Sequence, residues 1–207
     1  PTRVLLRRLS LAVEPGEGLM IVGPSGSGKS ALLRTVTGLW ASGGGRILRP
    51  APQHMLFLPQ QPYMLLGGSL RNQLLYPQPE RQVADARLLD LLEQVNLPDL
   101  AERCGGLGAE LDWDKTLSVG EQQRLAFARL LLTAPRFAFL DEATSALDMA
   151  NEGRLYRALM ATRTTPISVG HRASILKYHA WVLEIQGEGR WQLIAAPEYR
   201  FHEQDGP

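Results

Sequence analysis

The sequence predicts an α/β fold that carries an inserted helical block and an antiparallel β part. Three observations predict it. Short apolar runs typical of strands alternate with a helix-like segment, a glycine-rich loop joins one strand to that segment, and the pattern becomes mainly helical at about residues 69–132. We interpret residues 1–207 as one domain, with a core at about 1–68 and 133–196, a helical subdomain at about 69–132 and a polar tail at 197–207.

The expected elements follow in chain order. Strands are expected at residues 4–13, 18–22, 55–58, 137–140, 167–169, 181–185 and 191–194, the last two as a hairpin. The turn Glu14-Pro15-Gly16-Glu17 separates the first two strands, because proline and glycine favour turn conformations. A helix is expected at 29–37, stopped near Gly38. In the inserted block, the residues that recur at helical spacing are Leu88, Leu89, Leu91, Leu92 and Val95.

The composition is typical of a globular protein, and the opening at Pro1 close to an expected strand suggests a piece cut from a longer one. Of the 207 residues, 44% are hydrophobic, and the formal net charge is +1 with acids and bases interspersed. Since Lys and Arg do not cluster, no nucleic-acid partner is expected. The single cysteine, Cys104, can form no internal disulfide, which favours a cytosolic setting. No apolar run approaches the roughly 18 residues of a membrane helix. The piece, which opens at Pro1 beside an expected strand, is therefore expected to be soluble by itself.

The strongest local motif is a glycine-rich loop between an apolar strand and a helix. It reads Gly23-Pro24-Ser25-Gly26-Ser27-Gly28-Lys29-Ser30 and fits G-x-x-x-x-G-K-[ST]. Glycines let such a loop wrap closely around phosphate, with backbone N–H groups and the helix N-terminus facing the charge. Lys29 is then expected to reach the β- and γ-phosphates, and the Ser30 hydroxyl to ligate Mg²⁺. The loop alone does not separate a kinase, a GTPase, a motor and a transporter ATPase.

Two carboxylates, Asp141 and Glu142, follow the apolar run 137–140, which is typical of a strand buried on both faces of a parallel sheet. Ligands of such sheets bind beyond the carboxyl ends of the strands, so both acids are expected beside the phosphate loop. Asp141 is expected to hold Mg²⁺ through water. Glu142 is expected to act as general base on an attacking water or to orient it. The alternative is an acidic strand end without a catalytic role.

A third motif opens an apolar helix that ends at Ala134-Pro135. It reads Leu117-Ser118-Val119-Gly120-Glu121-Gln122-Gln123-Arg124. It resembles the signature sequence of ABC ATPases, L-S-G-G-Q, with Val119 in place of Gly and Glu121 in place of Gln. Ser118 with Glu121 three residues later also fits a capping box, which would explain the pair by the helix start alone.

The order of the remaining motifs favours the family. Gln60 matches the Q-loop glutamine, Ser145-Ala146-Leu147-Asp148 matches the D-loop, and His171 matches the switch histidine. The resemblance covers nearly the whole chain. It implies a P-loop NTPase (RecA-like) core of the ABC ATPase type, with a helical subdomain and an antiparallel β part.

The resemblance also implies a mechanism. Two copies would form a homodimer around two ATP molecules with Mg²⁺, each nucleotide lying between the phosphate loop of one copy and Ser118 and Gly120 of the other. Asp148 would act across this interface, Gln60 would sense Mg²⁺ and the water, and His171 would contact the γ-phosphate. Closure of the dimer would drive a transmembrane permease domain of the same polypeptide at the cytosolic face of a membrane.

Further strings narrow the resemblance to the peroxisomal-type half transporters of subfamily D and their bacterial permease–ATPase relatives. They include Gly38-Leu39-Trp40, the run 57–64 and the run 70–77. The implied cargo is a fatty acyl-CoA ester, cobalamin or a peptide. Two other classes stay open: a soluble ABC-type ATPase, which would carry coiled-coil inserts or tandem cassettes, and a non-hydrolysing regulatory module, against which Glu142 and His171 argue.

Overall fold

The computed structural model describes residues 4–41 and 43–201, and the chain divides into two compact units. The first unit comprises Pro1–Phe57, Pro135–Glu142 and Arg163–Pro207, and the second comprises Leu58–Ala134 and Ala143–Thr162. The helical unit is therefore larger than the expected block at 69–132. It includes residues 143–162 because their helix packs on the helices at 119–133 and 85–94. The loop after the latter also bonds to it, since Asn96 Nδ2 donates to Asn151 Oδ1 at 2.7 Å.

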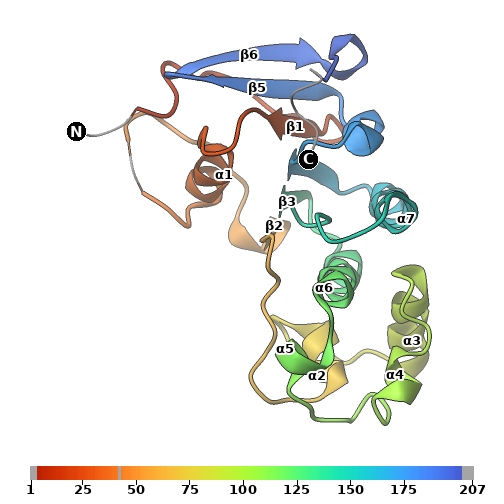
Figure 1. Cartoon of the computed structure of the whole chain (residues 1–207). Helices are drawn as coiled ribbons and strands as arrows, with labels where there is room; N and C mark the ends of the chain where they lie inside the picture. Colours follow the sequence, from red (N-terminus) through yellow and green to blue (C-terminus); the bar gives the residue numbers. More distant parts are fainter. Residues whose placement is uncertain (1–3, 42, 202–207) are drawn as a thin grey trace. The chain divides into compact units, whose positions relative to one another are not determined.

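The first unit contains a six-stranded sheet with the strand order β2-β3-β4-β1-β5-β6 (Figure 1). The strands are β1 (Leu19–Val22), β2 (Met55–Leu58), β3 (Phe137–Asp141), β4 (Thr165–Val169), β5 (Trp181–Gly187) and β6 (Arg190–Ala195). Strands β3, β4, β1 and β5 run parallel, and β6 pairs antiparallel with β5. Every residue of β1, β3 and β4 is buried, as the apolar runs predicted.

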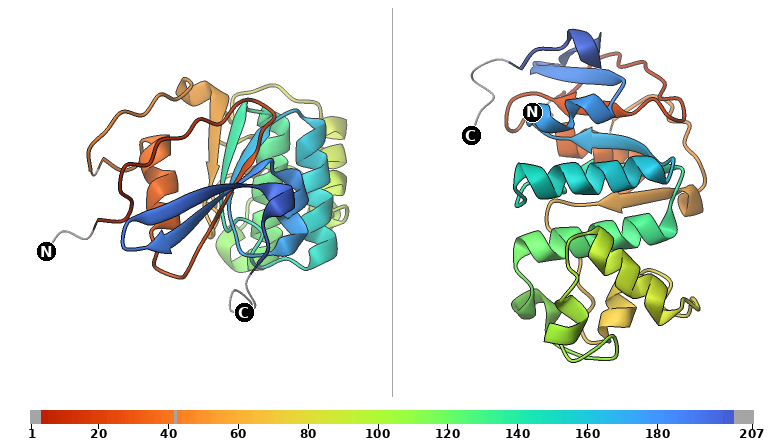
Figure 2. Two further views of the ribbon diagram at one scale, coloured as in Figure 1. Left: turned by 90° about the horizontal axis from the view of Figure 1, so that it is seen from above. Right: turned by 90° about the vertical axis from the view of Figure 1, so that its right-hand side faces the viewer.

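The core of this unit lies between the sheet and α1 (Lys29–Thr37), which packs on β3 and β4 (Figure 2). Side chains two residues apart along each strand share a face, so alternate strand residues reach the same cluster. The cluster consists of Leu19, Ile21, Leu33, Phe137, Phe139, Ile167, Val169, Leu183 and Ile185. The helix ends where the sequence predicted, because Gly38 takes a φ of 83° and its N–H donates to the carbonyls of the last turn.

The predicted strand at 4–13 is wrong. These residues make a single β-bridge, between Leu6 and Gly189, and Arg8 has a φ of 52°, which interrupts an extended path. Leu6, Leu9, Leu11 and Val13 nevertheless pack against the core cluster. The apolar pattern therefore predicted correctly that the segment packs against the core. The segment has an irregular backbone, however, and is not a strand of the sheet.

The second unit is helical, as the leucine spacing predicted. Its helices are α2 (Leu70–Leu75), α3 (Asp85–Gln94), α4 (Leu100–Arg103), α5 (Trp113–Thr116), α6 (Val119–Thr133) and α7 (Met149–Ala161). Arg129 of α6 is buried and donates to the carbonyls of Gln73 at 2.5 Å and Tyr63 at 2.6 Å. Burial lowers the pKa of Arg129 to about 10, so it stays charged and binds these segments together.

Three short 3₁₀ helices, Pro52–His54, Ala173–Tyr178 and Ala196–Glu198, complete the chain's elements in the described residues. The predicted polar tail at 197–207 begins inside the last of them, so residues 197–198 belong to a 3₁₀ helix. Tyr199 is buried instead of solvated, and its hydroxyl donates to Glu184 Oε1 at 3.3 Å. The remainder of the expected tail, residues 202–207, lies outside the described residues.

His179 is a structural histidine of the first unit. Its Nδ1–H donates to the Ile175 carbonyl at 2.9 Å, so Nε2 accepts the Ser168 hydroxyl at 2.8 Å. Burial lowers the pKa of His179 to about 4, against 6.5 for an exposed histidine. The folded chain therefore holds this ring neutral, and its protonation on acidification favours the unfolded chain.

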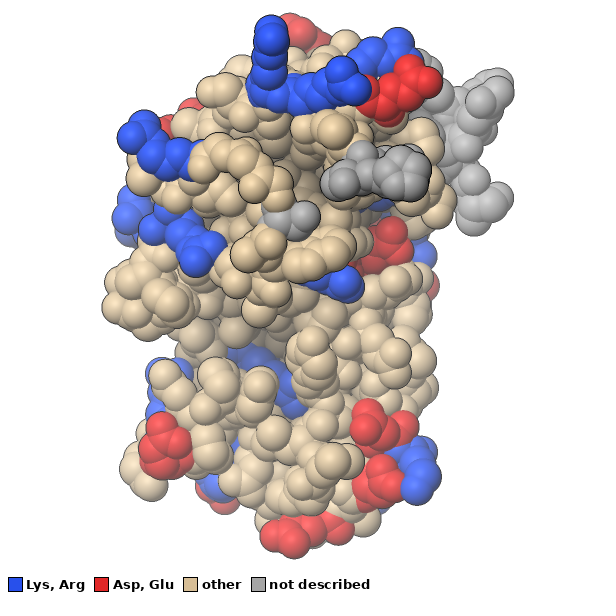
Figure 3. Space-filling view, turned by 90° about the vertical axis from the view of Figure 1, so that its left-hand side faces the viewer, with Lys and Arg blue, Asp and Glu red and all other residues tan. Residues whose placement is uncertain are grey.

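The surface is mixed in charge. On the face drawn in Figure 3, acidic and basic side chains are interspersed over a mostly uncharged surface, in keeping with the formal net charge of +1. Among the described helices, none has both the length and the apolar character needed to cross a membrane.

Candidate active site

The glycine-rich loop folds as a tight turn between β1 and α1 of the first unit. Gly23, Gly26 and Gly28 have φ angles of 143°, 72° and 102°, which side-chain-bearing residues rarely adopt. A Cβ at Gly23 would lie 2.3 Å from the Ile185 carbonyl oxygen, and one at Gly28 would lie 3.0 Å from Leu5. Close packing therefore excludes a side chain at Gly23, and at Gly28 a side chain would press on Leu5.

Lys29 extends back over the start of this loop. Its ammonium donates to the carbonyl oxygens of Gly23 at 2.7 Å and Pro24 at 3.0 Å. The positive charge thus lies at the mouth of the loop, beside the N-terminus of α1, which adds partial positive charge of its own. This arrangement suits an anion with several oxygens, such as a polyphosphate.

Ser27 supplies a further polar atom in the loop. The side chain is buried, and among residues 4–41 and 43–201 no group forms a hydrogen bond with its Oγ. Buried hydroxyls are nearly always hydrogen-bonded, so this oxygen is suited to a bond with a ligand held by the loop. Together with the glycine cradle, it indicates that the loop fits a phosphate group.

Two of the three residues expected at the magnesium site, Ser30 and Asp141, lie together, and the third, Gln60, belongs to the second unit. Ser30, in the first turn of α1, donates from Oγ to Asp141 Oδ1 at 2.7 Å, and Asp141 is the buried last residue of β3. One hydroxyl and one carboxylate form an oxygen donor set of the kind that Mg²⁺ shares with phosphate and water. In the described part of the chain, no cluster of three or more His, Cys, Asp or Glu side chains forms a denser metal site.

Glu142 and His171 follow neighbouring parallel strands at the same edge of the sheet. Asp141 pairs with Val169, and the Glu142 N–H donates to the Val169 carbonyl at 3.1 Å. Glu142 has a φ of 49°, so the chain leaves the extended path of β3 at the residue after Asp141. His171 follows two residues after Val169 and is exposed. The first unit thus places Lys29, Ser30, Asp141, Glu142 and His171 at the carboxyl ends of its strands and around the loop that follows β1.

The remaining predicted residues, Gln60, Ser118, Gly120 and Asp148, belong to the second unit. Ser118 caps α6 in a full capping box, accepting from the Glu121 N–H at 3.3 Å while Glu121 Oε2 accepts from the Ser118 N–H at 2.9 Å. The capping role therefore exists, and it holds the start of the signature segment in one conformation. Asp148 likewise caps α7, with Oδ1 accepting from the Asn151 N–H at 2.7 Å.

Glu121, which departs from the family signature, is held by a basic residue. Arg103 of α4 donates to Glu121 Oε1 at 2.5 Å. Burial alone would raise the pKa of Glu121, but hydrogen bonds from Ser118 and Arg103 together lower it. The other departure, Val119, is 51% exposed. Neither substitution disturbs the local fold.

Gly120, the second glycine position of the signature segment, lies close to residues 146–147. A Cβ there would lie 3.3 Å from the Ala146 carbonyl oxygen and 3.4 Å from Leu147 Cδ2. A larger side chain would push the start of α6 away from the segment 145–148. Gly120 is therefore a point of close approach between two of the predicted motifs.

Two residues of this site were missed by sequence reasoning. Arg103 is separated from Glu121 by 18 positions, and no local pattern marks it as a partner. Gln123 is fully buried on α6 and bonds to both the Gln60 and the 145–146 segments. A signal for Gln123 did exist, since it stands four and seven residues before Phe127 and Leu130 on an apolar helix face, where a buried amide requires partners.

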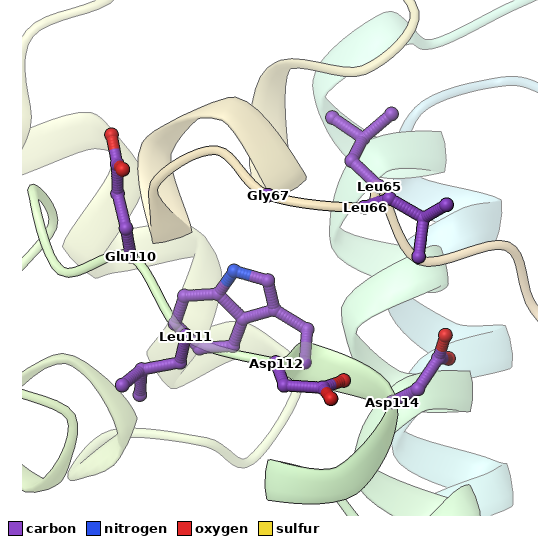
Figure 4. Close-up of a pocket in the computed structure, with 8 residues that line it drawn as sticks. Leu65, Leu66, Gly67, Glu110, Leu111, Asp112 and Asp114 are labelled. Atoms are coloured by element: carbon purple, nitrogen blue, oxygen red, sulfur yellow. The ribbon is translucent and has the colours of Figure 1, made fainter.

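The second unit also carries a shallow pocket of about 380 Å³ (Figure 4). It is lined by residues 65–67 and 110–114. One of the lining residues is buried Trp113, whose indole N–H donates to the Gly68 carbonyl at 2.9 Å. Leu66 of the rim is 95% exposed and nearby Tyr63 is 67% exposed. Exposed apolar side chains beside a hollow are typical of a surface that contacts another polypeptide.

The chain is similar to known proteins over most of its length. The family model described as "ABC transporter" matches residues 6–145. An uncharacterized ABC transporter ATP-binding protein of Synechocystis sp. is 57% identical over 192 residues, which are 93% of this chain and 29% of that protein. The human lysosomal cobalamin transporter ABCD4 is 44% identical over 200 residues, which are 92% of this chain and 33% of that protein.

A solved structure is also similar. The structure of a bacterial Atm1-family ABC exporter with ATP bound has a TM-score of 0.80 and 27% sequence identity, and the match covers 94% of this chain and 36% of that chain. The chain thus spans 29% and 33% of the length of the two curated relatives above.

Proposed function

Because the chain belongs to the ABC transporter family and forms its ATP-binding domain, with subfamily D transporters among its relatives, we propose that it hydrolyses ATP to drive a membrane transporter. One observation carries the proposal. Ser30 and Asp141, which are 111 positions apart in sequence, meet at 2.7 Å beside the phosphate loop. A structural loop would not require that pair, whereas a Mg-nucleotide site does.

Each predicted site residue of the first unit then has a role in binding or hydrolysing ATP. The loop and Lys29 hold the phosphates, and Ser30 and Asp141 hold Mg²⁺. When bound, Mg²⁺ neutralises charge on the phosphate oxygens. Glu142 accepts a proton from the attacking water or polarises it, and His171 contacts the γ-phosphate and helps to position the water. Positioning and charge stabilisation supply most of the catalysis of phosphoryl transfer.

The second unit supplies residues to a second copy. In the proposed homodimer, Ser118 and Gly120 of one copy complete the ATP site of the other, Asp148 acts across the interface, and Gln60 senses Mg²⁺ and the water. Support comes from the family match and from the rigid presentation of the signature segment, which its capping box, Arg103 and the contact of Gly120 with 146–147 all hold.

Complementation between two inactive variants tests this arrangement. Lys29→Ala removes the phosphate contact, and Ser118→Asp keeps an N-cap for α6 but sets a negative charge toward the partner's phosphate. Each variant alone is expected to lose ATPase activity. A one-to-one mixture should regain about a quarter of wild-type activity, because half of the dimers are mixed and each mixed dimer has one intact site. Activity no higher than the sum of the separate variants would show that loop and signature do not act in trans.

The proposed partner in the cell is a membrane permease domain of the same polypeptide, which places this domain at the cytosolic face. The exposed surface formed by Tyr63, Leu66 and the pocket at 65–67 and 110–114 is the proposed contact. The candidate cargo remains a fatty acyl-CoA ester, cobalamin or a peptide. ABCD4, one relative, is a cobalamin transporter.

Tyr63→Ala tests the contact in the full-length protein. Loss of an aromatic anchor typically weakens an interface by about 10-fold or more. We expect the full-length ATPase activity to become that of the isolated domain, with the isolated domain itself unchanged. Leu89→Ala is the matched control, since Leu89 is also an exposed apolar residue of the same unit but lies on α3. If the two variants have equal effects on the full-length ATPase activity, Tyr63 is not part of the contact with the permease domain.

A further inference from the structure

One buried amide joins three of the predicted motifs. Gln123 of α6 is 0% exposed, its Nε2 donates to the Gln60 carbonyl at 2.9 Å and to Ser145 Oγ at 3.2 Å, and its Oε1 accepts from the Ala146 N–H at 3.0 Å. Its own helix begins at the signature residue Ser118. All of these residues lie in the second unit.

The chemistry of these bonds selects glutamine. The carbonyl of Gln60 accepts only and the N–H of Ala146 donates only, so the side chain at 123 must donate with one end and accept with the other. A carboxylate at 123 would face the Gln60 carbonyl with a second acceptor. Methionine has the same length and would make none of the three bonds.

The helix contacts the segment 145–148 at a second point. Gly120 lies one turn before Gln123 and packs on Ala146 and Leu147, so both residues face the same segment. The segment ends at Asp148, the cap of α7. A shift of the 145–148 segment would therefore have to move the start of α6, or break the hydrogen bonds of Gln123.

We propose that Gln123 is a positioning residue that holds the Gln60 segment, the 145–148 segment and the signature helix as one element of the composite ATP site. This rests on the proposed function, in which Gln60 senses the nucleotide of its own copy while Ser118, Gly120 and Asp148 address the partner. The side chain of Gln123 is occupied by the Gln60 carbonyl, Ser145 and the Ala146 N–H, so its proposed role is to act through these segments. It ties the sensing segment to the residues presented to the second copy, so that binding in one site sets the conformation offered to the other.

The test compares Gln123→Met with Gln73→Met in chains that also carry Glu142→Gln. Gln73 is an equally buried glutamine of the same unit. Its amide bonds to the Leu65 backbone and to Arg129 near the end of α6, and to neither the Gln60 carbonyl nor the 145–148 segment. The readouts are the thermal midpoint, binding of a fluorescent ATP analogue to the monomer, and mass in solution with Mg-ATP. Steady-state kcat and KM are measured for the same two substitutions with Glu142 intact.

For Gln123→Met we expect monomer nucleotide affinity within about twofold of the parent, since no phosphate contact is lost. The protein concentration needed for ATP-dependent pairing should rise about 10-fold or more, and kcat should fall with little change in KM. Gln73→Met should lower the thermal midpoint but leave pairing and kcat unchanged. If the two variants behave alike in pairing and kcat, Gln123 is a structural residue only, and the inference is overturned.

Two outcomes need separate readings. If Gln123→Met does not fold, Gln123→Glu decides, because it retains an acceptor for the Ala146 N–H and loses only the donated bonds. Normal pairing by Gln123→Glu would then overturn the inference. If the Glu142→Gln parent itself binds ATP and does not pair, the proposed dimer is at fault, and that result is seen before any Gln123 variant is measured.

Discussion

Replacement of Glu142 by Gln is expected to preserve ATP binding and to lower turnover by about 10²–10⁴-fold, the usual contribution of a general base. The amide has the size of the carboxylate but cannot accept a proton from water. The Glu142 N–H donates to the Val169 carbonyl at 3.1 Å, and the substitution leaves this backbone bond intact. The glutamine side chain should therefore occupy the position of the carboxylate. Single-turnover hydrolysis and nucleotide affinity measure the two quantities separately.

The same variant should also pair stably in Mg-ATP, since slow hydrolysis leaves the sandwiched nucleotide intact. Its mass in solution is expected to double with Mg-ATP and to stay that of the monomer with Mg-ADP. Glu188→Gln is the control, because Glu188 also has a positive φ, of 54°, but lies in the β5–β6 turn. Near-normal steady-state turnover by Glu142→Gln would exclude Glu142 as the base.

The parts of the fold that were predictable depend on local chemistry. The helix at 29–37 and the strand at 55–58 were predicted to the residue. Gly28 and Gly38, both with positive φ, delimit the helix, and such glycines are visible in the sequence. The membership of β1, β3 and β4 in a buried parallel sheet followed from apolar runs, since both faces of such strands are covered.

The features that the sequence did not predict depend on partners distant in sequence. Strand formation at 4–13 required a neighbouring strand, and apolar alternation does not show whether one is available. Gln123 and Gln60 are 63 positions apart, and the motifs around each can be recognised without any sign that they touch. Val119 and Glu121 depart from the signature sequence, and the sequence does not show their surroundings. In the structure the valine is exposed and Glu121 bonds to Arg103, so the segment accommodates both.

Replacement of Asp141 by Asn is expected to separate Mg²⁺ binding from nucleotide binding. The amide oxygen can still accept from Ser30 Oγ, so the link between α1 and β3 at 2.7 Å should survive. The negative charge is lost, and with it the attraction for a divalent cation. We expect the Mg²⁺ concentration for half-maximal turnover to rise by about 100-fold, consistent with the 1.5–3 kcal/mol, roughly, of hydrogen bonds to charged groups. Binding of a fluorescent ATP analogue in EDTA should be unchanged or tighter.

Ser30→Ala distinguishes the contribution of Ser30 to Mg²⁺ binding from that of Asp141. It removes a neutral hydroxyl and leaves the carboxylate, so a smaller rise, about 10-fold, is expected in the same Mg²⁺ titration. Asp90→Asn, an exposed acid of α3, controls for loss of one negative charge. The decisive quantity is the gain in analogue affinity when Mg²⁺ is added, which does not depend on turnover. If that gain is as large in Asp141→Asn as in the wild type, Asp141 does not hold the metal, and its bond to Ser30 serves only to join the helix to the sheet.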